Sequence, residues 1–365
     1  MKYIFLSIIL NIVLSIHVHA RTTGRAGSLV SILSGVREEC EVVPDSFFPR
    51  VRTLMAEVAA QEDPAARAVY SATLAHLLMQ NTQRAAASSR DTSSPTDSIE
   101  EWSEREYEQY AASMYRNALR DMDILYGTPT CDWLPLVLRG RDEKVFGSSM
   151  LHVVWQAMAA DFPPYRRTDY DLPSYADIMA FYASRSKREA ELRMSLDSLE
   201  TVEDRVVRRK GYEVLVRQYE DIPSCDMAYD ALAGLTDDKA GKVALLRKAL
   251  DRYPRSVALR NALSTALRPI LNYQMPLLCY PDKEYDIPLT IANMKGMTQT
   301  IYRMPDDFAI NYRSDTSVVR QVRMKGKVLR RDKVAFPLHP VEEVWHDTLR
   351  WKAPDLGVYA LVSEG

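Results

Sequence analysis

Histidine and cysteine are the side chains in this sequence best suited to nucleophilic or metal chemistry, and their spacing favours neither. Four histidines lie outside the first twenty residues: His76, His152, His339 and His346. A structural zinc site usually draws on closely spaced pairs of ligands, and the four cysteines include no C-x-x-C pair. We therefore predict no metal site and no cofactor.

Two of these histidines lie in a context that could indicate chemistry. The sequence "WHD", Trp345 to Asp347, places His346 beside an acid, but neighbours in a strand point to opposite faces. We therefore do not expect a catalytic dyad there. His152 lies in the apolar stretch "MLHVVWQAMAADF", Met150 to Phe162, which predicts an interior helix with His152 as a core residue.

Motifs of the common enzyme classes are absent from the sequence. It has no G-x-S-x-G elbow, no H-E-x-x-H, no phosphate-binding glycine loop and no G-x-G-x-x-G. Two carboxylates that meet in a cleft leave no such motif, so a hydrolase with an unrecognised site stays as a third hypothesis for function. The leading expectation is a protein that is not an enzyme, with no catalytic, cofactor-binding, metal-binding or thioester residues.

The first twenty residues, "MKYIFLSIILNIVLSIHVHA", predict a signal peptide over 1–20. Lys2 precedes an apolar run from Ile4 to Ile16, which is shorter than the roughly 20 residues of a membrane-spanning helix, and Ala20 fits signal peptidase. We expect a mature chain that begins at Arg21 in the bacterial periplasm or cell envelope, with no stable membrane span. An uncleaved anchor is the alternative.

Export changes what the cysteines imply. Cys40, Cys131, Cys225 and Cys279 are an even number, and an oxidising compartment would allow two disulfides in any of three connectivities. Buried free thiols are the equal alternative. The charge balance of 47 Lys+Arg against 49 Asp+Glu gives a net charge of −2, which does not favour nucleic acid as a partner.

Residues 21–270 are predicted to form an α-helical region, because apolar residues recur at helical spacing from Ser46 to about Leu267. The clearest helix begins after Ser103, which with Glu106 predicts a capping box. Its apolar stripe predicts one helix that ends at Gly127. The stripe and its hydrophobic staple comprise Trp102, Tyr107, Tyr110, Met114, Ala118, Met122 and Leu125.

Further helix boundaries follow from local signals. Asp63 before Pro64 predicts an N-terminus, and Ser174 predicts another. Lys187 to Tyr219 is long enough for two helices, and the polar segment Ser88 to Ser98 predicts a loop.

A repeat-like unit is predicted near 224–267. "KVALLRKALDRYPRS", Lys242 to Ser256, resembles the second helix of a tetratricopeptide repeat, with Ala249 five residues before Pro254. "CDMAYDALAGL", Cys225 to Leu235, fits the helix before it, and "VALRNALSTAL", Val257 to Leu267, fits the helix after it. The sequence departs from the repeat at Lys242, where a small residue is usual.

After Pro269 the apolar period changes to two, which predicts a C-terminal β-sandwich over 271–365 with about seven short strands. We expect hairpins that turn at Lys295-Gly296 and at Lys325-Gly326. Pro288 predicts an edge strand, and the basic segment Arg320 to Lys333 predicts a solvated strand pair. The fold class is therefore α+β and multidomain, with a helical, solenoid-like region before an immunoglobulin-like or fibronectin-like sandwich.

This order of parts resembles the N-terminal region of bacterial alpha-2-macroglobulin family proteins. The similar stretches are "AVYSATLAHLLMQN", "DSIEEWSEREYEQYAASMYRNAL", "LLRKALDRYPRS", "MPLLCYPDKEYDIPLTIANMKGMTQTIYRM" and "APDLGVYALVSEG". The resemblance implies an envelope-associated protease trap that is cut in a bait segment and, in many members, captures the protease through a thioester within C-x-E-Q. Position +3 from each cysteine is Val43, Leu134, Ala228 or Asp282, so no thioester residue is carried over.

The leading functional hypothesis is the N-terminal structural or interaction portion of an alpha-2-macroglobulin-like endopeptidase inhibitor, without bait or thioester regions. Its partners would be the remaining macroglobulin domains or a companion chain, together with target proteases. The alternative is a stand-alone periplasmic adaptor that binds a protein through its tetratricopeptide-like helices. Neither hypothesis involves nucleic acid.

Overall fold

The computed structural model describes residues 26–27, 29–34, 47–86, 98–134, 136–137, 143–273, 275, 278–337, 339, 343–352 and 355–364. Its contacts divide the chain between Glu203 and Asp204 into an N-terminal and a C-terminal unit. The predicted signal peptide, nearly all of the predicted loop Ser88 to Ser98, and Cys40 lie outside the described residues.

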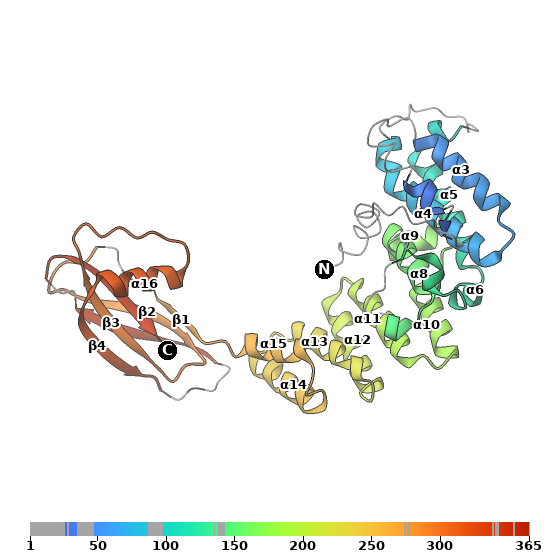
Figure 1. Ribbon diagram of the computed structural model, residues 1–365. Helices are drawn as coiled ribbons and strands as arrows, with labels where there is room; N and C mark the ends of the chain where they lie inside the picture. Colours follow the sequence, from blue (N-terminus) through green and yellow to red (C-terminus); the bar gives the residue numbers. More distant parts are fainter. Residues whose placement is uncertain are drawn as a thin grey trace. The chain divides into compact units, whose positions relative to one another are not determined.

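The N-terminal unit is built of helices (Figure 1). They are α3 (Phe47–Ala60), α4 (Pro64–Ala86), η2 (Ile99–Glu101), α5 (Glu104–Leu119), α6 (Met122–Tyr126), η3 (Thr130–Trp133), α7 (Glu143–Phe146), α8 (Met150–Asp161), α9 (Pro164–Arg167), η4 (Thr168–Tyr170), α10 (Tyr175–Ser184) and α11 (Arg188–Glu200).

One hydrophobic core joins these helices. α4 packs along α5, and both contact α8. The interior position predicted for Met150 to Phe162 is confirmed, because half of the residues of α8 are buried and only Ala160 is exposed. Aromatic rings supply much of the volume, and the largest fully buried ones are Trp133, Trp155, Tyr70, Tyr107, Tyr115, Tyr182 and Phe162. This core holds the helices that carry the polar groups considered below.

The predicted helix starts are confirmed. Ser103 caps α5 in a capping box, in which its backbone N–H donates to Oε2 of Glu106 over 2.6 Å. The staple is present, with the rings of Trp102 and Tyr107 5.5 Å apart. Asp63 accepts from the N–H of Ala65 at the start of α4, and Ser174 caps α10. Such caps satisfy N–H groups that have no partner in the first helical turn.

The prediction of one helix from Ser103 to Gly127 is wrong in its second half. α5 ends at Leu119, and the side chain of Asp121 caps the separate helix α6. Asp is a strong N-cap residue, so it allows the chain to start a new helix in the middle of an unbroken apolar stripe. Gly127 does end the second helix, α6.

Four helices begin the C-terminal unit: α12 (Arg205–Gln218), α13 (Asp226–Gly234), α14 (Lys239–Arg252) and α15 (Val257–Ala266), with the short turn η5 (Pro223–Cys225) before α13. The two helices predicted between Lys187 and Tyr219 are present as α11 and α12. α13 packs against α12, α14 and α15, an arrangement that is compatible with helical repeats.

The strands follow as two small antiparallel sheets. Strands β1 (Ile270–Tyr273), β2 (Glu284–Ala292) and β5 (Val344–Lys352) form one sheet in the order β1-β2-β5. Strands β4 (Lys327–Ala335), β3 (Gly296–Met304) and β6 (Val358–Glu364) form the other in the order β4-β3-β6. The α+β character of the chain is therefore confirmed.

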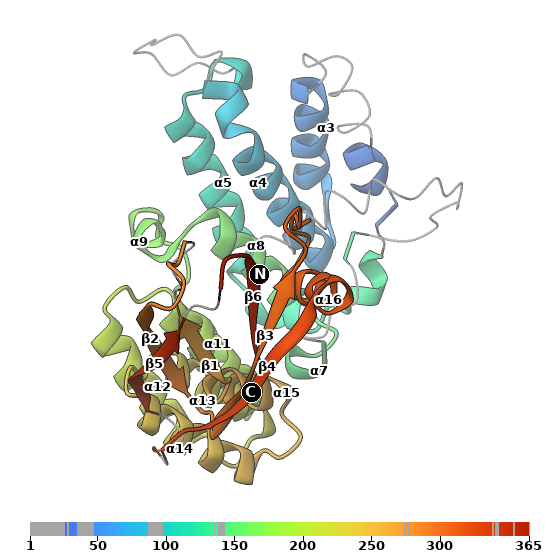
Figure 2. The same cartoon turned by 90° about the vertical axis from the view of Figure 1, so that its left-hand side faces the viewer.

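The two sheets share a core. Ile287, Leu289 and Ile291 of β2 pack with Met297 of β3 and Trp345 of β5. The other face of the second sheet is covered by helix α16 (Asp315–Lys325), which lies against β3 in both ribbon views (Figure 2). There Val322 packs with Tyr302, Met304 and Val362.

The predicted hairpin at Lys295-Gly296 is wrong. β2 and β3 lie in different sheets, and β2 pairs with β5 while β3 pairs with β4 and β6. Period-two alternation predicts which face of a strand is buried but carries no information on its partner. Six strands occur among the described residues, where about seven were expected.

The predicted turn at Lys325-Gly326 and the strand pair over Arg320 to Lys333 are also wrong. Residues up to Lys325 belong to α16, whose capping box is formed by Ser314 and Ser317, and only β4 that follows is a strand. The helix is favoured by Asp315 in its first turn and by Arg323 and Lys325 in its last, because these charges complement the helix dipole.

Pro288 lies in β2, the middle strand of its sheet, and the predicted edge strand is therefore wrong. β1 pairs only with Leu289 to Ala292, so Pro288 has a strand neighbour on one side alone. The middle strand thus tolerates a residue without an N–H at a point where its short neighbour has ended.

Candidate functional site: a polar groove in the helical unit

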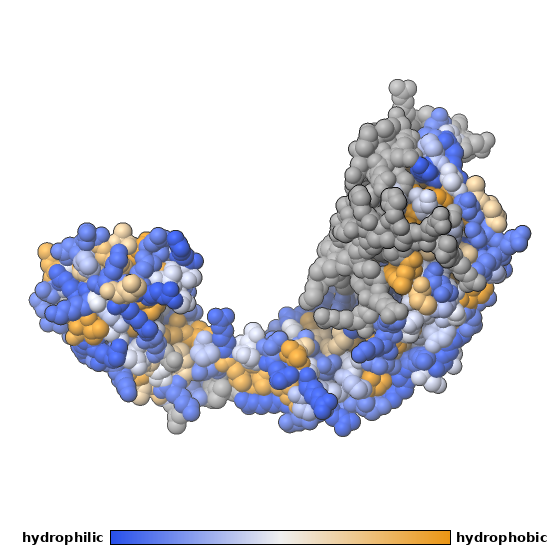
Figure 3. All heavy atoms as spheres, viewed as in Figure 1, coloured by the Kyte–Doolittle hydropathy of each residue, from blue (hydrophilic) through white to orange (hydrophobic). Residues whose placement is uncertain are grey.

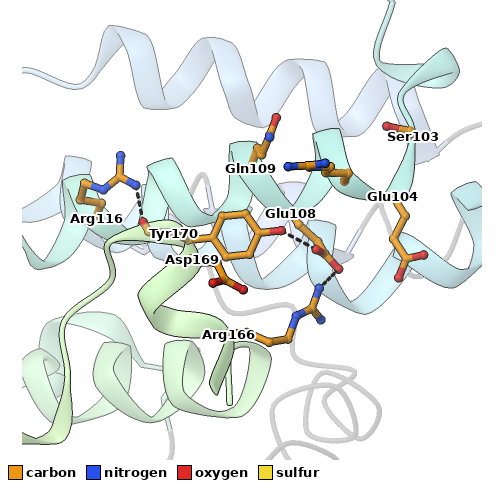
Figure 4. A pocket seen from close by; sticks show the side chains of 9 residues that line it. Ser103, Glu104, Glu108, Gln109, Arg116, Arg166, Asp169 and Tyr170 are labelled. Carbon is orange, nitrogen blue, oxygen red and sulfur yellow. Dashed lines mark hydrogen bonds and ion pairs between the residues drawn. The ribbon is translucent and has the colours of Figure 1, made fainter. Parts of the chain in front are cut away.

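A groove of about 1010 Å³ opens on the surface of the N-terminal unit beside α5, α9 and η4 (Figure 4). The sequence determines where the helices that line the groove begin. The capping box at Ser103 starts α5, and Pro164 starts α9. The lining side chains are polar: Ser103, Glu104, Arg105, Glu108, Gln109, Arg116, Arg166, Asp169 and Tyr170.

Glu108 is the buried acid of this groove, with only 5% of the residue exposed. Its carboxylate forms an ion pair with Arg166 and accepts a hydrogen bond of 2.7 Å from the hydroxyl of Tyr170. The hydrogen bond to Glu108 raises the pKa of Arg166, and burial raises the pKa of Tyr170. A buried charge needs such partners, so these three side chains lock α5 to α9 and η4.

At the other end of the groove, the side chain of Arg116 binds backbone carbonyl groups of η4 and of the residue that follows it. Its guanidinium donates to the carbonyl oxygen of Tyr170 and, over 3.3 Å, to that of Asp171. Asp171 has a left-handed backbone with φ 49°, and it ends η4. Arg116 therefore satisfies carbonyl groups that a left-handed helix end leaves open.

These contacts decide what the groove can do. Arg116, Arg166 and Glu108 are engaged within the protein, whereas Glu104, Arg105, Gln109 and Asp169 are exposed. The hydroxyl of Ser103 donates to Glu106 in the capping box. The groove thus offers exposed hydrogen-bonding groups of both charges, which can bind a polar surface.

A second polar cluster lies between α4, α5 and α8. Oδ2 of Asp161 is 2.8 Å from Nδ1 of His76 and accepts a hydrogen bond of 2.6 Å from the hydroxyl of Tyr115. The Asp161 side chain is 3% exposed, and burial raises the pKa of Tyr115 well above its usual value. The cluster resembles the acid–histidine half of a triad, but among the described residues His76 pairs with Asp161 and not with a hydroxyl or thiol nucleophile.

His152 is a core residue, as predicted from its apolar stretch. Its ring stacks on Phe146 with centroids 3.4 Å apart, and burial lowers its pKa to about 3. A neutral imidazole is therefore built into the core at physiological pH. No cluster of three metal-ligating side chains occurs within the described part of the chain.

The remaining histidines lie on the strands and their connections. His346 of β5 is 3.2 Å from the hydroxyl of Thr290 on β2, and His339 stacks on Trp345 with centroids 4.3 Å apart. The Asp347 side chain instead accepts from the N–H of Thr348. His346 and Asp347 therefore contact different groups.

The cysteines occupy separate environments. Cys131 is exposed and Cys225 is buried, each as a free thiol, and Cys279 is half-buried. Burial raises the pKa of Cys225, which makes its thiol a weak nucleophile. Within the described part of the chain, neither Cys131 nor Cys225 is in a disulfide.

The groove and the cluster around Asp161 were both missed in the sequence. Tyr170 and Glu108 are 62 residues apart, and His76 and Asp161 are 85 apart, so no local spacing indicates either contact. A charged residue inside an otherwise apolar helix face, as Glu108 beside Tyr107 and Ala111, is the one available signal.

Comparison with known proteins adds no assignment to this geometry. No protein-family model, curated protein or solved structure matches the chain significantly. In the part of the chain that is described, no helix is long and apolar enough to cross a bilayer.

Proposed function

We propose that the chain is a non-enzymatic protein-interaction module: the N-terminal structural portion of an alpha-2-macroglobulin-like endopeptidase inhibitor of the bacterial envelope. On this proposal, residues 1–20 direct export, the helices near 224–267 act as a tetratricopeptide-like unit, and 271–365 form a macroglobulin-like β-sandwich. Its partners are the remaining macroglobulin domains, or a companion chain, and the target proteases.

The observation that carries the proposal is the pair of antiparallel sheets with a shared core that directly follows paired helices. A helical segment followed by two packed sheets is the order of parts that the resemblance implies. The polar groove supports the same class of function, because its buried Glu108 is paired with Arg166 and Tyr170 and its exposed polar groups can bind a partner.

A stand-alone adaptor is the second candidate, and α12 favours it. Val206, Val207 and Val214 on this helix are about half exposed or more, while Tyr212, Leu215 and Val216 are buried. A helix with apolar side chains on both sides can bind a partner through the exposed side.

Protease capture tests the leading proposal. The purified chain is incubated with a panel of proteases and analysed on denaturing gels, with methylamine labelling in parallel. We expect no covalent adduct and no amine incorporation, since no cysteine has a glutamine three residues on. Any inhibition should be reversed by dilution. An SDS-stable adduct would contradict a purely structural role.

The intact mass of the native protein distinguishes the two candidate functions. The inhibitor proposal expects the intact mass of the native product, or of its stable complex, to include bait and thioester regions. The adaptor proposal expects a self-sufficient protein of about this size in the envelope fraction. For both, N-terminal sequencing should return Arg21, and recovery of Met1 from a membrane pellet would contradict export.

A further inference from the structure

The two sheets have four edge strands, and three of them are protected. Edge strands expose unpaired N–H and C=O groups, which proteins usually shield with charge or by keeping the strand short. β1 has only 4 residues. β4 carries Lys327, Arg330, Arg331, Asp332 and Lys333, and β5 carries Asp347, Arg350 and Lys352.

β6 has neither protection. It is 7 residues long, and from Val358 to Ser363 it has no charged side chain. Glu364 is the one charge, and it forms an ion pair with Arg323 of α16. Among the described strands, β6 pairs with β3 alone (Figure 2). Its residues from Val358 to Leu361 are half-buried. Figure 3 shows that the visible face of the protein is mostly hydrophilic, with small apolar areas.

We propose that β6 is a dimerisation edge, which pairs antiparallel with β6 of a second copy of this chain. A two-fold axis at Leu361 would place each Leu361 opposite its own copy. Ala360 would then lie opposite Val362 of the partner subunit, and Tyr359 opposite Ser363 of the partner subunit. The last two pairs each set a smaller side chain against a larger one, which suits close cross-strand packing.

This register also continues the existing core. Val358, Ala360 and Val362 lie on the sheet face that packs against Tyr302, Met304 and α16. Pairs of residues symmetric about 361 keep the same face, so antiparallel pairing would join two such faces into one sheet. Each copy contributes a three-stranded sheet, and no edge β6 remains exposed.

A second copy is the occupant that the charges favour. The paired segment brings no like charges together, because Val358 to Ser363 is uncharged in both copies. The symmetric interface needs nothing beyond this chain, and most soluble homo-oligomers form by such isologous contacts. The inference does not depend on the proposed function.

Sedimentation velocity of the full chain, from about 1 µM to about 200 µM, tests the proposal. We expect a reversible monomer–dimer equilibrium. Leu361→Lys places two like charges on the axis and should raise the dissociation constant at least about tenfold. Leu329→Lys, on the protected edge strand β4, is the matched control and should leave the constant within about twofold. A monomer at every concentration, or equal effects of the two variants, would overturn the proposal.

Disulfide cross-linking tests which residues of the two β6 strands lie opposite each other, and it does not require a variant that weakens the dimer. In Leu361→Cys, the two new thiols would lie across the axis at a distance that a disulfide can span. Mild oxidation should give a covalent dimer whose linked peptide contains Cys at 361 in both copies. Leu329→Cys should give no more covalent dimer than the unchanged chain, which has the exposed Cys131. A link at 329, or none at 361 in a folded variant, would show that β6 is not the contact.

Discussion

The helical N-terminal unit and the strands of the C-terminal unit reach stability in different ways. The helices share one continuous core whose largest members are aromatic, and that core also accommodates His152 and the nearby cluster around Asp161. The strands instead surround two small clusters, one between the sheets and one under α16. Much of β4 and β5 is exposed.

The difference shows where each region is vulnerable. In the helical unit the interior determines the fold, so truncating a buried ring or leaving a buried charge unpaired should be costly. In the sheets the pairing of strands determines the fold, and single side chains contribute less. Four predictions test this contrast.

Truncation of Trp155 should have the largest effect. The ring is 1% exposed in the helical core, and Trp155→Ala should lower the free energy of unfolding by about 3–5 kcal/mol through lost burial and a cavity. Leu349→Ala, at a half-buried position in β5, should cost only about 1–2 kcal/mol. Urea titrations followed by circular dichroism measure both. Equal losses would contradict the contrast between the two regions.

Acid should weaken the helical unit through His152. Its folded-state pKa of about 3 lies below the usual 6.5, so between these values the unfolded chain binds a proton that the folded chain does not. Stability should therefore be unaffected by this group above pH 6.5 and fall as the pH drops towards 3. Between pH 7 and pH 4 the loss is about 3 kcal/mol.

The control for this prediction is His152→Phe, which keeps a ring against Phe146. The pH dependence of its unfolding free energy should be smaller than that of the unchanged chain by about the same amount. If the two chains lose stability in parallel as the pH falls, other groups account for the acid sensitivity.

Loss of the groove carboxylate should have an intermediate effect. Glu108→Gln removes the ionic partner of Arg166, whose side chain is 32% exposed, so solvent moderates the cost to about 1–2 kcal/mol. Glu104→Gln, on the same helix but exposed, should change stability by less than about 0.5 kcal/mol. Thermal unfolding of both variants measures the difference, and a neutral Glu108→Gln would show that the groove does not lock α5 to α9.

Helix caps should give the smallest effects and the same effect in both regions. Ser103→Ala and Ser314→Ala each remove a capping box, at α5 and α16 respectively, and each should cost about 1 kcal/mol. Caps act within one helical turn, so the surroundings should matter little. A much larger loss at Ser314 would indicate that α16 depends on its own capping more than on packing against β3.

The helices were also easier to predict from the sequence than the pairing of the strands. Helix starts were predicted well, because Asp63, Ser103 and Ser174 act on N–H groups within one turn of themselves. Strand partners were not, because alternation in β2 and β3 specifies only their buried faces. α16 was missed because Val318, Val319 and Val322 are β-branched, although their spacing also fits a helix.

The candidate site could not be predicted in the same way. The partners of Glu108 come from α9 and η4, and only the packing of these segments brings Arg166 and Tyr170 to it. The boundary between the two units could not be predicted either. Contacts divide the chain after Glu203, where no change of composition occurs, whereas the change from helix to strand falls between Ala266 and Ile270.

The sheet order has a consequence for biosynthesis. A nascent chain emerges from its N-terminus, so helices that pack against their sequence neighbours, such as α4 with α5 and α10 with α11, can associate early. β2 has only the short β1 beside it until Val344 to Lys352 has been translated, and β3 waits for β6 still longer. During that interval the apolar face of β2 lacks its final cover, and a chaperone that shields nascent strands would be most useful to this region.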